Sequence, residues 1–176
     1  MARVLDGVSV AQPELTLEAS VFSSPVGAIG LLACDGSLVA AGFTSDVEKL
    51  ALRYPHDSLS EVSAIDGITD RIARYFAGDL VAIDEVETDP VGSPRKKGAW
   101  RAMRTVGPGP MSYRELSLRM EPPASPRSAA RACATNPVAL VVPCHRFVGS
   151  DGKMHGYYWG TDIKEALLEH ERRFMI

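Results

Sequence analysis

The chain has 176 residues, of which 45% are hydrophobic and 23% charged, with a net charge of −3 at pH 7. These values exclude disordered, collagen-like and coiled-coil chains. No apolar run approaches the roughly 20 residues of a membrane helix, and the start, Met1–Gly7, is too polar for a secretory signal. Three cysteines without Cys-x-x-Cys spacing indicate neither a disulfide framework nor a zinc site. We therefore expect an intracellular protein with free thiols and no membrane partner.

Charge is distributed unevenly along the chain. Residues 1–94 contain 5 Lys/Arg against 15 Asp/Glu, whereas residues 95–146 contain 10 Lys/Arg against 2 Asp/Glu. A basic segment inside an acidic protein is typical of a surface that binds DNA or RNA. Two oppositely charged domains that dock on each other would produce the same pattern, so charge alone leaves both interpretations open.

The first half predicts a small antiparallel sheet followed by a helix. Apolar stretches and turn signals predict three strands and two turns: 17–22, 29–34 and 38–43, with turns at 24–27 and at Asp35-Gly36. Apolar residues recur at helical spacing from Asp66 to Phe76, and Gly78 ends this helix. Residues 81–86 predict one more strand. This half contains no catalytic signature, and we expect a structural role for it.

A polar, turn-rich stretch from Thr88 to Lys97 predicts a domain boundary near residue 90. We therefore expect an N-terminal α/β domain, 1–90, and a C-terminal DNA-binding and catalytic domain, 91–176. A short amphipathic helix from Trp100 to Val106 begins the second domain, and Gly107–Pro110 ends it.

Two short helices joined by a tight turn come next, and their basic surroundings predict a helix-turn-helix. Ser112 and Glu115 form a capping box at the start of the first helix. The second helix runs from its N-cap, Ser125, to Thr135 and stops before Asn136-Pro137. Its many alanines favour close, sequence-independent contact with a narrow groove over base reading. The alternative is a structural alanine-rich helix.

The most informative motif is Pro143–Arg146, which reads Pro-Cys-His-Arg and follows the apolar run Val138–Val142. The apolar run predicts a buried strand. Cationic neighbours favour the thiolate form of Cys144, and a thiolate beside an imidazole is a nucleophile arrangement. We interpret Cys34 and Cys133 as core residues.

A compact aromatic loop, Gly156–Gly160, precedes the last helix, which Thr161 caps and which runs over 162–173. Three residues of this helix recur at i, i+4 and i+8 on one face: Ile163, Leu167 and Glu171. A carboxylate on an apolar face needs a partner, and His145 is the candidate for Glu171. The alternative is a solvated Glu171 near the C-terminus.

From Ser112 to Glu171 the chain resembles the O6-alkylguanine-DNA alkyltransferases. The shared motifs are Ser112-Tyr113-x-x-Leu116, Arg127, Asn136-Pro137, Pro143-Cys144-His145-Arg146, Gly156-Tyr157, Trp159-Gly160 and Lys164-x-x-Leu167-Leu168-x-x-Glu171, with weaker matches at Gly92-Ser93-Pro94 and Trp100. The resemblance implies an α/β (α+β) fold. Its N-terminal part is a ribonuclease-H-like sheet-and-helix domain, and its C-terminal part is mostly helical, with a winged-helix-like helix-turn-helix.

The resemblance also implies direct-reversal DNA repair, in which Cys144 accepts an alkyl group from O6 of guanine. His145 takes the thiol proton through water, Glu171 polarises the imidazole, and Asn136 holds the active-site turn. The target carbon is shielded in duplex DNA, so the base must flip out through the minor groove. The thioether product has no carbonyl for water to attack, so each molecule reacts once. No metal or organic cofactor is expected.

Two further residue sets follow from the resemblance. Residues expected to contact DNA are Tyr113, Arg127, Ser128, Ala129 and Arg131, with Arg127 filling the space that the base vacates. Residues expected to wall the alkylguanine pocket are Tyr113, Phe147, Val148, Ser150, Gly156, Tyr157 and Tyr158. The partner is double-stranded DNA containing O6-alkylguanine. We expect a monomer in solution, and the sequence leaves cooperative binding on DNA open.

The chain departs from the family pattern at positions that bear on affinity and alkyl range more than on the reaction: Arg95, Lys96, Glu121, Arg131 and Phe147. A non-catalytic lesion-binding relative would lack Cys144. A helix-turn-helix regulator would need base-reading side chains. A cysteine hydrolase would need an oxyanion hole, for which the sequence contains no signature. In the N-terminal half Cys34 and His56 do not form a zinc set.

Overall fold

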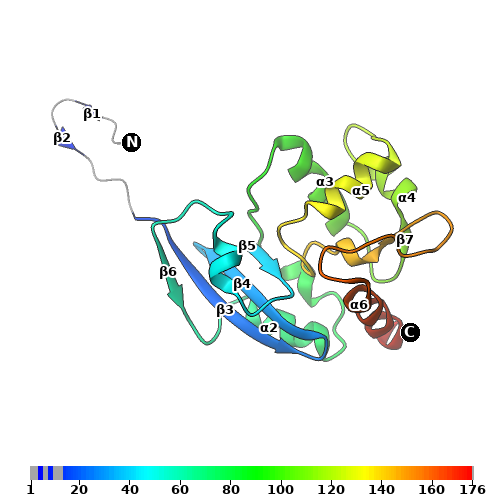
Figure 1. Cartoon of the computed structure of the whole chain (residues 1–176), viewed down its shortest axis with the longest axis horizontal. Helices are drawn as coiled ribbons and strands as arrows, with labels where there is room; N and C mark the ends of the chain where they lie inside the picture. The colour runs from blue at the N-terminus through cyan, green and yellow to red at the C-terminus, as the bar shows by residue number, and fades with distance from the viewer. Residues whose placement is uncertain (1–3, 6–7, 10–13, 176) are drawn as a thin grey trace.

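The computed structural model describes residues 4–5, 8–9 and 14–175. Near the start, β1 (Val4–Leu5) pairs antiparallel with β2 (Val8–Ser9). The rest of the polar segment Met1–Gly7 lies outside the described residues. The main body places a sheet beside a group of helices, with the C-terminal helix at the end opposite β1 and β2 (Figure 1).

A four-stranded sheet contains most of the first half, in the order β5-β4-β3-β6. Three strands form the predicted antiparallel meander: β3 (Thr16–Ser24), β4 (Gly27–Cys34) and β5 (Ser37–Gly42). Asp35 and Gly36 have φ values of 48° and 80°, as a two-residue type I′ hairpin requires. The fourth strand, β6 (Ser58–Glu61), pairs parallel with β3. The sequence did not predict β6, because Ser-Leu-Ser-Glu contains a single apolar residue.

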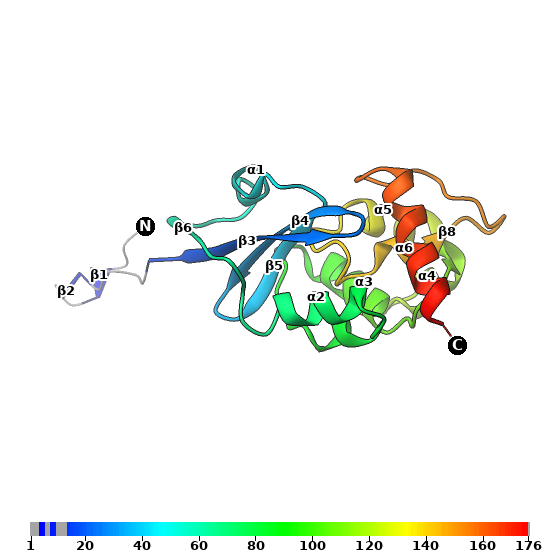
Figure 2. The same ribbon diagram turned by 90° about the horizontal axis from the view of Figure 1, so that it is seen from below.

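Helices cover both faces of this sheet (Figure 2). On one face lies α1 (Val47–Ala51), whose two buried residues pack against Leu32 and Val39. On the other face lies α2 (Thr69–Phe76), which packs in the main hydrophobic cluster. The prediction for α2 begins three residues too early, but its end at Gly78, where φ is 110°, is confirmed. The five-residue α1 was not predicted, since it is shorter than two helical turns.

The predicted strand over residues 81–86 is wrong, because this segment forms a 3-10 helix, η1 (Ala82–Glu85). Ala82 and Ile83 are neighbours and both are buried, whereas successive strand residues point to opposite faces. The Arg104 guanidinium donates to the carbonyl oxygens of Ile83, Asp84 and Val86 at 3.2, 3.0 and 2.8 Å. These bonds satisfy carbonyls that a sheet ladder would otherwise pair.

The second half is mostly helical. Its helices are α3 (Pro94–Arg104), α4 (Tyr113–Arg119), α5 (Pro126–Ala134) and α6 (Thr161–Phe174). The Ser112–Glu115 capping box and the Ser125 N-cap are present as predicted. A short parallel pair, β7 (Met111–Ser112) with β8 (Phe147–Val148), connects the start of α4 to the segment after Cys144. Gly160 occupies the N-cap position of α6, so the predicted Thr161 cap is wrong by one residue.

The predicted strand Val138–Val142 is also wrong. The run is buried, as predicted, but it folds as a turn in which Leu140 has a φ of 72° and Val142 N–H bonds Val138 O at 2.9 Å. Only Val138 makes a bridge, to Ala41 at the edge of the main sheet. Burial on all sides explains why the composition resembles a central strand.

One hydrophobic cluster includes residues of both halves, from Ile29 in β4 through Trp100 in α3 to Leu167 in α6. The predicted division near residue 90 stays a prediction. In the described part of the chain no helix has the length and apolar character needed to cross a membrane.

Candidate active site

Cys144 is the first residue of a 3-10 turn, η2 (Cys144–Arg146), directly after the buried turn at Val138–Val142. Its side chain is buried, and Sγ lies 3.8 Å from the Tyr157 hydroxyl oxygen. Asn136 ties the preceding turn together. Its Nδ2 donates to Val142 O at 2.8 Å, and its Oδ1 accepts Val138 N–H at 2.9 Å. The amide side chain therefore fixes the backbone that presents the thiol.

His145 and Glu171 form a buried pair. Nε2 of His145 lies 2.8 Å from Oε1 of Glu171, and neither side chain has any solvent exposure. Because a carboxylate only accepts hydrogen bonds, Nε2 bears the proton in this pair. The other ring nitrogen, Nδ1, has no hydrogen-bond partner among the described residues. This buried nitrogen is the one that can accept a further proton.

Glu171 is held by groups from three parts of the chain. Tyr75 Oη donates to it at 2.9 Å, Gly109 N–H at 2.8 Å, and Arg146 Nε at 3.0 and 3.1 Å to its two oxygens. Burial raises the pKa of this carboxyl, but the hydrogen bond from His145, the charge of Arg146 and the Gly109 amide lower it to about 2. Glu171 is therefore ionised at neutral pH.

Burial lowers the pKa of His145, although the Glu171 carboxylate partly opposes this shift. The imidazole is therefore neutral at pH 7, with the lone pair of Nδ1 free. Burial also raises the pKa of the Cys144 thiol, against the lowering influence of Asn136, Tyr157 and Lys164. The expectation that the neighbouring His-Arg cations favour the thiolate is wrong, because His145 and Arg146 both turn to Glu171. The thiol therefore needs a base.

Lys164 is a site residue to which the sequence interpretation gave no role. It is buried on α6, its Nζ donates to Phe147 O, and Nζ lies 5.8 Å from the ring centroids of both Tyr113 and Tyr157. Lys164, Leu167 and Glu171 are the buried residues of α6, at i, i+3 and i+7. This helical spacing was available in the sequence.

Tyr75 and Gly109, which hold Glu171, carried no signal in the sequence that pointed to this role. Tyr75 is 96 residues from Glu171 and Gly109 is 62 residues from it. Only the tertiary fold brings these groups together. Arg146 was identified as part of the Cys-His-Arg motif, but its role as a partner of Glu171 was not.

The structure separates the expected pocket residues into three groups. Tyr113 and Tyr157 lie near Cys144 and Lys164, whereas the Phe147 side chain is fully buried in the core and Val148 is nearly so. The remaining expected positions are exposed on the loop between β8 and α6: Ser150, Gly156 and Tyr158. The Tyr158 hydroxyl accepts a hydrogen bond from Arg53 at 3.1 Å.

The residues expected to contact DNA lie mainly on α5. Arg127 and Arg131 are exposed and Ser128 is partly exposed. Ala129 is fully buried and packs in the core together with Ala132, so the expectation that it contacts DNA directly is wrong. The side chains on the inward face of α5 are small because this face packs closely against the hydrophobic core.

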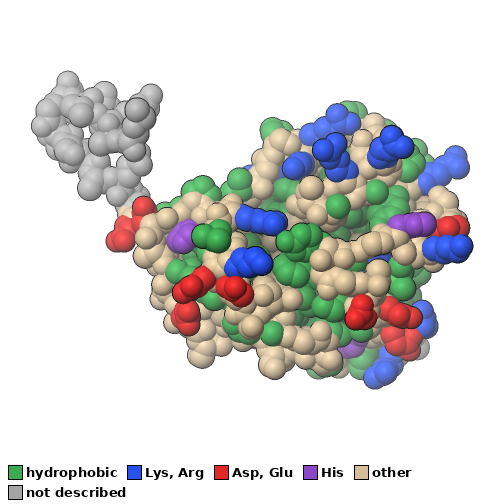
Figure 3. Space-filling view, in the orientation of Figure 1, with side chains coloured by type: hydrophobic (Ala, Val, Ile, Leu, Met, Phe, Trp, Pro, Cys, Tyr) green, Lys and Arg blue, Asp and Glu red, His purple; other side chains and the backbone are tan. Residues whose placement is uncertain are grey.

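Exposed cations gather around α3, α4 and α5. We call this the basic face, which comprises Arg95, Lys96, Arg114, Arg119, Arg127 and Arg131. Figure 3 shows Lys and Arg side chains along the upper edge of the molecule, over these three helices. Across the described residues no three His, Cys, Asp or Glu side chains lie close enough to hold a metal ion.

Comparison with known proteins agrees with this geometry. The family model described as "6-O-methylguanine DNA methyltransferase, DNA binding domain" matches residues 94–173. A methylated-DNA–protein-cysteine methyltransferase from Salmonella typhimurium is 39% identical over 125 residues, which cover 69% of this chain and 73% of the relative. One from Methanosarcina acetivorans is 32% identical over 153 residues, which cover 86% of this chain and 96% of the relative.

Solved structures extend the likeness to the whole fold. The crystal structure of Mycobacterium tuberculosis O6-methylguanine methyltransferase superposes with a TM-score of 0.75 at 28% identity, covering 91% of this chain and 95% of that one. Mycobacterium tuberculosis OGT in complex with DNA gives 0.72 at 30% identity, covering 89% and 94%. The chain therefore belongs to the methylated-DNA–protein-cysteine methyltransferase family.

Proposed function

We propose that this protein repairs DNA by transferring an alkyl group from O6 of guanine to Cys144. The observation that carries the proposal is the buried His145–Glu171 pair beside Cys144, in which Nδ1 of His145 has no hydrogen-bond partner in the described part of the chain. A neutral imidazole with one nitrogen oriented by a carboxylate is the usual arrangement for activating a cysteine nucleophile.

The proposed reaction begins when a water molecule passes the thiol proton of Cys144 to Nδ1 of His145. The imidazolium that forms is stabilised by the ionised Glu171. Sγ then attacks the alkyl carbon from the side opposite O6, the carbon–oxygen bond breaks, and the bonding electrons leave with guanine. The departing guanine takes up the proton that His145 received from Cys144, so charge balances. The thioether cannot be hydrolysed, so each molecule reacts once.

DNA binding is proposed for the basic face. α4 and α5 act as a helix-turn-helix, with α5 in the minor groove and Arg131 on a phosphate. Arg127 fills the space of the flipped base, and Ser128 faces the groove beside it. Tyr113, which burial keeps protonated by raising its pKa to about 12, assists extrusion. With Tyr157 it walls the pocket for the alkylguanine, and Val148, Ser150 and Gly156 border the pocket.

Substituting the nucleophile tests this proposal. Cys144→Ala is expected to abolish removal of the methyl group from a duplex containing O6-methylguanine, while its affinity for that duplex stays within about twofold, since the thiol is not on the basic face. Lesion loss is followed by chromatography of the DNA nucleosides. Cys34→Ala, which changes a thiol at the far end of the β4–β5 hairpin, is the matched control. Residual transfer by Cys144→Ala would refute the assigned nucleophile.

A further inference from the structure

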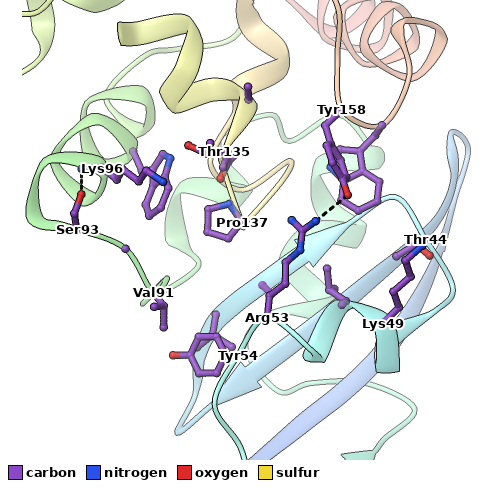
Figure 4. Close-up of a pocket in the computed structure, with 18 of the residues that line it drawn as sticks. Thr44, Lys49, Arg53, Tyr54, Val91, Ser93, Lys96, Thr135, Pro137 and Tyr158 are labelled. Atoms are coloured by element: carbon purple, nitrogen blue, oxygen red, sulfur yellow. Dashed lines mark hydrogen bonds between the residues drawn. The ribbon is translucent and has the colours of Figure 1, made fainter.

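A cavity of about 390 Å³ lies apart from Cys144, where the two halves of the chain meet. Residues of β5 and α1 form one side. The start of α3, the end of α5 and Tyr158-Trp159 form the other side (Figure 4). Pockets that bind small molecules typically measure roughly 300–1,000 Å³. The volume therefore suits a ligand the size of a single nucleotide.

Three cations line this cavity: Lys49 on α1, Arg53 just after it and Lys96 on α3. None of them belongs to an ion pair within the described ranges of the chain. Among the described residues one carboxylate lines the cavity, Asp46, which accepts the backbone N–H of Lys49 at 2.9 Å as the N-cap of α1. Cations without carboxylate partners around a concave surface attract an anionic group.

The cavity also has aromatic walls. Tyr158 is 62% exposed at its rim, and its ring lies edge-on to Trp159 with centroids 4.8 Å apart. Arg53 donates to the Tyr158 hydroxyl at 3.1 Å, a contact drawn in Figure 4 that holds the ring in place. A basic groove with an accessible aromatic ring is the combination that binds single-stranded nucleic acid, by phosphate contact and base stacking.

The cavity is continuous with the basic face. Lys96 belongs to both, and Ala134 and Thr135 at the end of α5 form part of the cavity wall. Figure 3 shows further Lys and Arg side chains near the middle of the same view, beside α1. A DNA strand that leaves α5 therefore meets these cations next.

We propose that this cavity binds one nucleotide unit of a single strand, with its phosphate held by Lys49 and Arg53 and its base stacked on Tyr158. The site is distinct from the alkylguanine pocket at Cys144, and it gives the N-terminal half a direct contact with the ligand. A free nucleotide has the same phosphate and base as a nucleotide unit of DNA, so the experiment compares both sources.

Intrinsic fluorescence can report occupancy of the cavity directly, because the chain has two tryptophans, Trp100 and Trp159, and both line it. The full chain is titrated at low salt with tetrathymidylate, thymidine monophosphate and inorganic phosphate. Tetrathymidylate is expected to quench the fluorescence saturably, at least tenfold more tightly than inorganic phosphate. Tight quenching by the mononucleotide as well would support the site and assign it to free nucleotides.

The Lys49→Ala/Arg53→Ala double variant, which leaves the basic face intact, is expected to weaken tetrathymidylate binding by about tenfold. It should also reduce the slope of log K against log salt by about 0.7 for each lost phosphate contact. The control is Arg173→Ala, an exposed cation near the end of α6, which should bind as the unchanged protein does. Transfer from free O6-alkylguanine base should be unchanged in the double variant, which separates this test from that of Cys144.

Two results would overturn the proposal. One is quenching by inorganic phosphate as tight as that by tetrathymidylate, which would show an anion site without base recognition. The other is a double variant with unchanged affinity and salt slope, which would place the oligonucleotide elsewhere.

Discussion

At Cys144, burial opposes the chemistry proposed for the residue. Burial raises the pKa of the thiol, so little thiolate exists before the substrate arrives. A reactive thiolate that forms only when the substrate is bound is protected from oxidation at other times. His145 is neutral and oriented, and Glu171 is ionised and fixed by Tyr75, Gly109 and Arg146. The reactivity of the cysteine therefore belongs to the whole set of residues.

Glu171 makes the free energy of unfolding depend on pH. Its pKa is 4.5 in the unfolded reference and about 2 in the fold, a difference that corresponds to about 3 kcal/mol. A lowered carboxyl pKa stabilises the fold above the unfolded value and ceases to do so as pH falls through the folded value. We expect the free energy of unfolding in urea to fall by about this amount between pH 5 and pH 2.

Glu171→Gln should remove this part of the acid dependence. At pH 7 the variant should be destabilised by about 3 to 5 kcal/mol, because Arg146 is left buried without a counter-charge, and it should lose alkyl transfer. The matched control is Glu165→Gln, an exposed position on the same helix, whose urea profile should follow that of the unchanged protein. An unaltered pH profile in Glu171→Gln would contradict the assigned role.

At the scale of elements, the end of β5 contacts and supports the loop that contains Tyr157. A Cβ atom at Gly42 would lie 2.3 and 2.4 Å from two ring atoms of Trp159, so the indole rests directly on the backbone of the strand. Phe43 packs edge-on against the same indole with centroids 6.4 Å apart. The first half of the chain therefore positions a loop of the candidate active site.

Gly42→Ala should shift Trp159 and with it Tyr157. We expect the rate of alkyl transfer to fall by on the order of tenfold, since small misplacements of reacting groups reduce rates strongly, while the affinity for undamaged duplex changes by less than about twofold. Trp159→Leu in the same chain should restore part of the rate by making room. Gly107→Ala adds a methyl group in open space and is the control. Equal loss of rate and affinity in Gly42→Ala would indicate general misfolding.

At the scale of the whole molecule, local signals predicted local structure. The hairpin at Asp35-Gly36, the Ser112–Glu115 capping box and the buried run 138–142 were all identified from neighbouring residues. Of the two failures, η1 is shaped by Arg104, which is distant in the sequence, whereas the turn at 138–142 is held by the nearby side chain of Asn136, whose bonds to this run the apolar pattern does not reveal. The pairing of His145 with Glu171 was predicted because helical periodicity placed a carboxylate on an apolar face.

The proposed role of the basic face concerns the whole molecule, because it acts on duplex DNA. Only duplex DNA requires a base to be flipped, so a residue that assists flipping should affect repair of duplex DNA alone. Arg127→Ala is expected to slow repair of a duplex by on the order of tenfold, in line with the few kcal/mol that unstacking requires. Its reaction with free O6-alkylguanine base should be unaffected. The two rates are measured side by side in single-turnover assays. Equal loss on both substrates would contradict a role in base flipping.

The central claim is stoichiometric transfer to one atom, the sulfur of Cys144. The most direct test is intact-protein mass spectrometry after incubation with excess duplex containing one O6-methylguanine, followed by peptide mapping. We predict a gain of a single methyl group per chain, located on the peptide that contains Cys144, and no further turnover. An unchanged mass with the duplex still bound, or a methyl group on Cys133 or Cys34, would contradict the account.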